Sequence, residues 1–178
     1  MSEREATSPE GLPPLKPLPA AAIGMALQKA DRYRLLNEPG EAESICRDVL
    51  ATAPDNAEAV ITLVLALTDQ FPRGLAGRFD EAMTLAGRLA DAFERAYYVA
   101  LICERRAKLH LRQGTPGCGP LAREWLTQAM ARYEEAVTLR PTGAEKSLLR
   151  FNACVRLMGR YAKLLAQQEP PDAPLLSD

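Results

Sequence analysis

The sequence has few of the residues that most catalytic and metal sites need. It contains one histidine, His110, and its four cysteines are widely spaced, with no C-x-x-C pair. Zinc therefore lacks a suitable ligand set, and a catalytic triad would depend on a single histidine without a carboxylate nearby. We interpret His110 as a packing residue. The sequence predicts a protein that is not an enzyme, with no metal and no cofactor.

A strong excess of one charge is also missing. The chain has 22 basic and 23 acidic residues, for a net charge of −1. Such a balance gives no broad basic field for nucleic acid or an anionic membrane surface. No apolar run approaches the roughly 18 residues that span a bilayer, and no basic-then-apolar leader begins the chain. We therefore expect a soluble, cytoplasmic protein.

Strand-like alternation of apolar and polar residues is almost absent, whereas a 3.6-residue period recurs along the chain. This pattern predicts an all-α protein of about seven helices. Their expected ranges are 20–36, 39–53, 56–70, 79–92, 94–113, 120–139 and 143–167. Pro39 and Pro120 suit the first turn of a helix. Two pairs have the spacing of a capping box, Asp55 with Glu58 and Thr142 with Glu145.

Proline-rich, polar sequence flanks the helical part at both ends. We expect residues 1–20 to form a disordered arm and residues 168–178 a disordered tail, because such composition cannot bury enough apolar surface to fold. The helical domain is expected over 21–167.

A weak internal repeat runs through the helical part. The segments PGEAESICRDVLATAPDNAEA (39–59) and LTQAMARYEEAVTLRPTGAEK (126–146) share an alanine that is followed twelve residues later by a proline. The pairs are Ala42 with Pro54 and Ala129 with Pro141. The segment 77–93 repeats the beginning of the pattern with Ala82. Small residues at these positions allow paired helices to approach closely.

These segments resemble the second helix of the tetratricopeptide repeat (TPR), a 34-residue helix–turn–helix unit. The resemblance covers roughly residues 22–155, as three repeats and a final helix. It implies a right-handed superhelical stack of antiparallel helix pairs. It also implies an adaptor or assembly helper, which binds a protein or peptide in a concave groove lined by the first helix of each pair.

Basic residues are expected in that groove. Arg105, Lys108 and Arg112 are spaced i, i+3, i+7 and share one helix face, and Asn152 and Arg156 share a face of the last helix. TPR proteins of the carboxylate-clamp kind use Lys, Arg and Asn on such faces, and the resemblance to them is partial. We expect a partner with an acidic segment. A solvated helix face remains the alternative.

Two other functions stay open. The same basic groove, together with Tyr98, could serve a small-ligand-binding protein or an enzyme. The last helix could instead support a purely structural homo-oligomer, because its apolar stripe is unusually wide. Residues 148–165 are therefore a candidate homodimer interface, unless Gly159 breaks the helix so that it folds back on the same chain.

The stretch QGTPGCGPLAREWL (113–126) looks at first like a phosphate-binding or reactive-thiol loop. A Walker-type loop needs a preceding strand and a Lys-Ser/Thr pair after its last glycine, and neither is present. We interpret the stretch as an enlarged turn in which Gly114 ends one helix. Leu121, Trp125 and Met130 are expected to anchor the next helix on the core. Cys118 is expected to be exposed in the turn, and the other cysteines to be buried.

Overall fold

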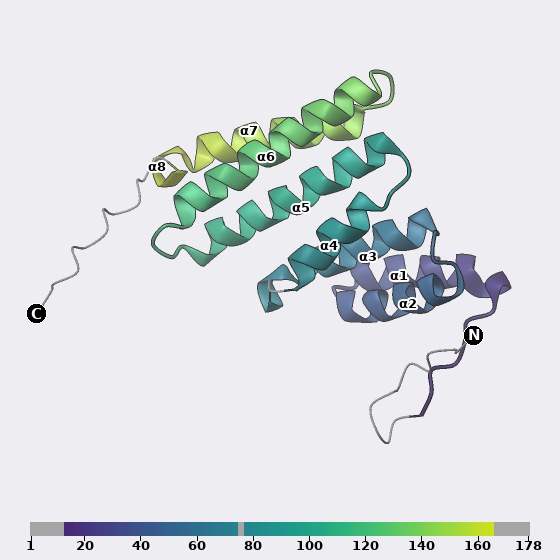
Figure 1. Cartoon of the computed structure of the whole chain (residues 1–178). Helices are drawn as coiled ribbons and strands as arrows, with labels where there is room; N and C mark the ends of the chain where they lie inside the picture. Colours follow the sequence, from purple (N-terminus) through teal and green to yellow (C-terminus); the bar gives the residue numbers. More distant parts are fainter. Residues whose placement is uncertain (1–12, 75–76, 166–178) are drawn as a thin grey trace, which may run out of the picture.

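The computed structural model describes residues 13–74 and 77–165 (Figure 1). Within these ranges the chain forms helices and no strand, which confirms the all-α prediction. The α-helices are α1 (Ile23–Leu35), α2 (Pro39–Thr52), α3 (Ala57–Asp69), α4 (Arg78–Gly87), α5 (Ala92–Gln113), α6 (Cys118–Leu139), α7 (Glu145–Arg160) and α8 (Ala162–Leu165). Two short 3-10 helices, η1 (Ala20–Ala22) and η2 (Phe71–Arg73), accompany them. The predicted tail, 168–178, lies outside the described residues.

Two predicted helix caps are wrong, because α3 and α7 begin one or two residues later than expected. The side chain of Asn56, not Asp55, caps α3 by accepting a hydrogen bond of 2.8 Å from the N–H of Ala59, because a turn after Ala53 delays the helix start. α7 begins at Glu145 without a side-chain cap, because Gly143 turns the chain with a φ of 90°. Thr142 therefore lies outside the helix that we expected it to cap.

The last predicted helix is in fact two. α7 ends at Arg160, the chain turns at Tyr161, and α8 folds against α6. The break lies close to Gly159, which agrees with the alternative that the helix folds back on its own chain.

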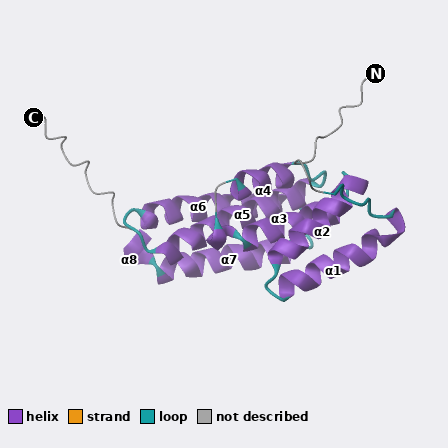
Figure 2. Ribbon diagram, turned by 90° about the horizontal axis from the view of Figure 1, so that it is seen from below, coloured by secondary structure: helices purple, strands orange, loops and turns teal. Residues whose placement is uncertain are grey.

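The helices form an elongated stack in chain order (Figures 1 and 2). Each of the helices from α1 to α7 packs against the next one, and α3 also contacts α1 and α5. The pair α1 and α2 lies at one end of the stack, and α7 and α8 lie at the other (Figure 1).

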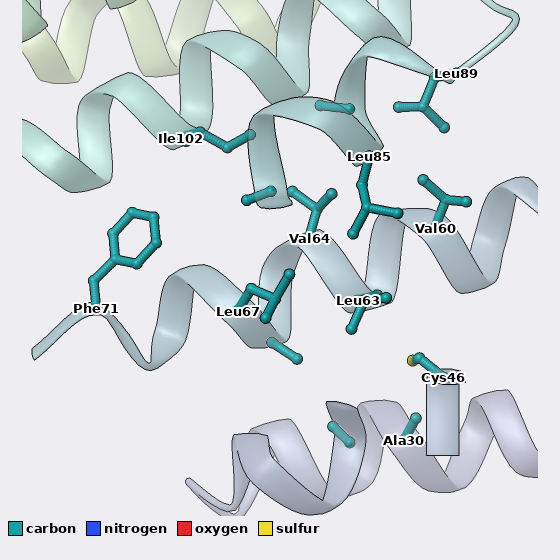
Figure 3. Close-up of a cluster of buried hydrophobic side chains, with 14 of the residues drawn as sticks. Ala30, Cys46, Val60, Leu63, Val64, Leu67, Phe71, Leu85, Leu89 and Ile102 are labelled. Atoms are coloured by element: carbon teal, nitrogen blue, oxygen red, sulfur yellow. The ribbon is translucent and has the colours of Figure 1, made fainter. Parts of the chain in front are cut away.

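α3 is the centre of the core in the first half of the chain. Its buried side chains, such as Val64 and Leu67, pack with Ile102 of α5 and with residues of the three helices α1, α2 and α4 (Figure 3). A second cluster fills the space among α5, α6 and α7, and the buried Tyr133 belongs to it. The apolar side chains of the helices thus pack into two large clusters, and Tyr98 packs against both of them.

The expected disordered arm already contacts the helical domain before its predicted end. Leu18 packs against a small cluster that includes Leu27 and Val49, and its carbonyl oxygen accepts a hydrogen bond of 3.0 Å from the hydroxyl of Thr52. Residues 1–12 of the predicted arm lie outside the described part of the chain.

The three alanines of the repeat pattern lie in the clusters of buried side chains between helices. Ala42, Ala82 and Ala129 have no exposed surface at all. A larger side chain at any of these positions must move a neighbouring helix, because protein interiors have few voids to accept extra atoms.

Ala42→Leu is therefore expected to reduce the free energy of unfolding by about 1–3 kcal/mol through overpacking. Ala51→Leu provides the matched control, since Ala51 lies on the exposed side of the same helix and should change stability by less than about 0.5 kcal/mol. Urea denaturation followed by circular dichroism measures both. Equal losses in the two variants would contradict a close helix crossing at Ala42.

Candidate functional site

A basic pocket lies where the end of α3, η2, α5 and α7 come together. Its cavity volume is about 290 Å³. Arg105, Lys108 and Arg112 of α5 line this pocket, and Arg150 of α7 adds a fourth cation. Asp69, the last residue of α3, lines it as well. The structure thus brings the three basic residues that we predicted on α5 into one site.

Asp69 connects the pocket to the first helix of the chain. Its carboxylate lies 2.6 Å from Nη1 of Arg105 and 3.0 Å from Nη2 of Arg34. Arg105 also donates to the carbonyl oxygen of Leu65 and to the hydroxyl of Thr68. Burial lowers the pKa of the Arg105 guanidinium, although the charge of Asp69 counteracts part of that effect. α1, α3 and α5 are therefore joined around one carboxylate.

Glu104 joins the pocket to the other end of the stack. This side chain is 1% exposed, and it accepts a hydrogen bond of 2.7 Å from the hydroxyl of Tyr133 on α6. Its other oxygen lies 3.3 Å from Nη1 of Arg150 and also pairs with Nζ of Lys108. Burial opposes the charge of Arg150, but the attraction to Glu104 raises its pKa overall. The buried carboxylate thus holds together α5, α6 and α7.

These pairings leave the pocket with surplus positive charge. Arg105 and Lys108 each have a carboxylate partner, whereas Arg112 is exposed and takes part in none of the ion pairs or hydrogen bonds found in residues 13–74 and 77–165. Four cations and one carboxylate line the cavity; Glu104 pairs with two of these cations, and Arg34 pairs with the lining Asp69. An anionic ligand could therefore enter without displacing a carboxylate.

The predicted residues of the last helix do not reach the pocket. Asn152 and Arg156 are exposed and are not among the residues that line it. The face of α7 that turns towards the stack carries Ser147, Arg150 and Cys154 instead. The structure therefore does not bring Asn152 and Arg156 together with the basic residues of α5 as we expected, because apolar residues cover so much of the circumference of α7 that they do not define its packed side.

Sequence reasoning missed both Arg150 and Glu104. A signal for Arg150 was available, since it lies four residues before Cys154, one of the cysteines that we expected in the core. Glu104 gave no such signal, because an acidic residue beside Arg105 is ordinarily solvated, and its burial depends on contacts with Tyr133 and Arg150.

The glycine-rich stretch 113–126 contains the end of α5 and the start of α6. Gly114 ends α5 in the left-handed conformation, with a φ of 61°, as predicted. Cys118 is the first residue of α6 and is buried, so the expectation that it is exposed is wrong. The four cysteines are all free and buried, and burial raises the pKa of Cys46 and of Cys154 to about 12. The thiols of Cys46 and Cys154 therefore carry almost no thiolate at neutral pH.

Trp125 anchors α6 through a cation–π contact. The guanidinium of Arg106 packs against two rings that contact each other, with its Cζ atom 4.1 Å from the centroid of Phe79 and 4.1 Å from the centroid of Trp125. Leu121, which we expected to share this anchoring role, is 42% exposed and does not. The enlarged turn thus positions an aromatic ring that binds α5 to α6.

His110 lies one turn after Arg106 on α5 and is partly buried. Burial, followed by the charge of Arg106, lowers the pKa of its imidazole. Its surroundings agree with the packing role that the sequence predicts. In the described ranges, no group of three or more His, Cys, Asp or Glu side chains has an arrangement that could hold a metal ion.

No helix of the described ranges has both the length and the apolar character needed to cross a membrane. Comparisons of the chain with protein-family models, with curated proteins and with solved structures find no match. The basic pocket and its surroundings are therefore the basis on which we infer a function.

Removal of the buried carboxylate tests its structural role. Glu104→Ala is expected to lower the free energy of unfolding by about 1–3 kcal/mol, because the buried hydroxyl of Tyr133 loses its acceptor and the partly exposed Lys108 and Arg150 lose an ion-pair partner. Glu135→Ala is the matched control, since Glu135 forms an exposed ion pair with Arg132 and should cost less than about 1 kcal/mol. Urea denaturation measures the difference. A loss at Glu104 no larger than that at Glu135 would show that the buried network does not hold the helices together.

Proposed function

We propose that the chain is a binding module for an acidic segment of a protein or peptide, and that it acts as an adaptor or assembly helper. The observation that carries the proposal is the basic pocket, in which Arg105, Lys108, Arg112 and Arg150 meet around a cavity of about 290 Å³. Guanidinium groups bind carboxylates through paired, charge-assisted hydrogen bonds, so an acidic side chain is the fitting ligand.

The spacing of the cations favours an extended chain as the ligand. Arg105 and Arg112 are seven residues apart on α5, which corresponds to about 10 Å along the helix axis. An extended peptide covers that distance with about three residues. Two acidic side chains of one peptide could therefore contact both ends of the row, with Lys108 between them.

The arrangement of the helices supports a TPR-like stack as part of this proposal. Consecutive helices pack as neighbours, and contacts also join α1 to α3 and α3 to α5, the helices that would come first in each pair. The pocket is lined from α3, α5 and α7, which is where a concave binding face would lie in such a stack. A small anionic ligand would use the same cations, and it is an outcome of the binding test.

Arg112→Glu tests the proposal with little risk to folding, because Arg112 is exposed. We expect it to weaken binding of a fluorescent hexaglutamate peptide with blocked ends about tenfold or more, as a charge reversal in the site should. Arg156→Glu is the matched control, with the same change of charge on an exposed position outside the pocket.

Fluorescence anisotropy measures the dissociation constants, with blocked hexaglutamine as the uncharged probe. Equal weakening by the two variants would show that only net charge matters and would contradict binding in the pocket. Binding of free glutamate as tight as that of hexaglutamate would favour the small-ligand alternative.

Self-association through α7 is a second candidate function. Leu148, Leu149 and Val155 of α7 are 49%, 69% and 46% exposed, so the residues that the structure describes leave an apolar surface uncovered at this end of the stack. These residues belong to the segment 148–165, which the sequence indicates as a candidate homodimer interface. A structural homo-oligomer would bury it.

If α7 forms a dimer interface, light scattering at micromolar concentration should give twice the mass of one chain, and Leu149→Lys should restore the mass of a monomer. Leu121→Lys is the control, since Leu121 is an exposed leucine on α6. A monomeric mass for the unsubstituted protein removes this candidate and leaves the basic pocket unaffected.

A further inference from the structure

The sequence that follows α8 has the composition of a ligand for the basic pocket. Residues 166–178 read AQQEPPDAPLLSD and contain Glu169, Asp172 and Asp178 but no lysine, arginine or histidine. Three negative side chains in thirteen residues match the surplus positive charge around Arg112.

The pocket and the start of this segment lie towards the same end of the helices. α5 ends at Gln113, just past Arg112, and α8 lies beside the turn that joins α5 to α6 (Figure 1). Figure 2 gives the same relation from below. α8 contacts α6, and α6 packs against α5, so roughly two helix spacings of 8–10 Å separate α8 from the far side of α5.

The length of the segment is sufficient to reach the site. Arg105 lies about 12 Å along the helix axis from the end of α5 at Gln113. Thirteen residues in extended form span up to roughly 43 Å. That reach exceeds the combined distance along and across the helices, which is on the order of 25 Å from the same helix geometry.

The segment at the other end of the chain fits less well. Residues 1–12 contain Glu3, Glu5 and Glu10, but also Arg4, and Lys16 follows in the connection to α1. Leu18 fixes that connection beside the beginning of α3, whereas the pocket lies at the opposite end of α3, at Asp69. Charge and position therefore favour residues 166–178 as the occupant.

We propose that residues 166–178 occupy the basic pocket of their own chain and compete there with acidic partners. This inference rests on the proposed function, because it assigns a regulator to the same pocket. A tethered segment has an effective concentration in the millimolar range, so even a weak contact lowers the affinity for an external peptide. A partner would have to displace the segment, and shielding by salt would weaken both contacts.

Two charge-matched variants of the full chain test the proposal. One carries Glu169→Gln, Asp172→Asn and Asp178→Asn, and the other carries Glu3→Gln, Glu5→Gln and Glu10→Gln. We expect the first to bind blocked hexaglutamate about three- to tenfold more tightly than the unsubstituted chain. The second should bind it with unchanged affinity.

The remaining outcomes of the binding experiment overturn the proposal. An equal gain in the two variants would show a general effect of net charge, and a gain only in the second would show that residues 1–12 are the occupant. If neither gains affinity while Arg112→Glu still weakens binding, the proposed function stands and the competing segment does not.

A measurement without a probe peptide keeps the inference separate from the proposed function. Amide chemical shifts of the unsubstituted chain are compared with those of the variant neutralised at residues 166–178. We expect chemical-shift differences at Asp69 and over residues 105–112. The size of these differences should not change across a tenfold range of protein concentration. Differences confined to residues 166–178 overturn the proposal, and differences that grow with concentration overturn it in favour of binding to a second copy.

Discussion

The buried carboxylate of Glu104 is the interaction on which the arrangement of the second half of the chain depends. A charge removed from water is stable only if other groups compensate it, and here they come from α5 itself, α6 and α7. The ion pairs with Glu104 thereby hold Lys108 and Arg150 in place at the wall of the pocket. The contacts that hold these three helices together also fix the positions of the cations that would bind a ligand. A site whose side chains are already ordered loses less conformational entropy on binding.

Asp69 has the corresponding role in the first half. It lies between Arg34 and Arg105 and so connects α1 with α5 across the end of α3. The pocket is therefore located between two carboxylate bridges, one towards each end of the stack. Because these bridges take up the charges of Arg105 and Lys108, the surplus that attracts an anion is concentrated on Arg112 and on the part of Arg150 that Glu104 does not neutralise.

The sequence predicted what depends on spacing within one helix and missed what depends on contacts between helices. The i, i+3, i+7 relation of Arg105, Lys108 and Arg112 is fixed by helix geometry, so these residues were found. The wide apolar surface of α7 does not reveal its packed side, so the pattern of this helix predicts the wrong surroundings for Asn152. Glycine and proline around Cys118 favour a loop, yet α6 starts at that residue. The burial of Glu104 follows from Tyr133 and Arg150, which no local pattern connects to it.

Some residues of the pocket stabilise the fold and others do not. Only substitutions of the second kind can change the binding of a ligand without also changing the stability of the protein. A change at Glu104 alters the charge of the pocket and the packing of three helices together, so lost binding in such a variant has two causes. Arg105 and Lys108 share this ambiguity, since each compensates a carboxylate. A change at Arg112 does not have this ambiguity, because Arg112 lines the pocket and has no ion-pair partner in the described residues. The surplus charge that the described part of the fold does not neutralise is therefore the part of the pocket that our proposals assign to a ligand, either another protein or residues 166–178 of the same chain.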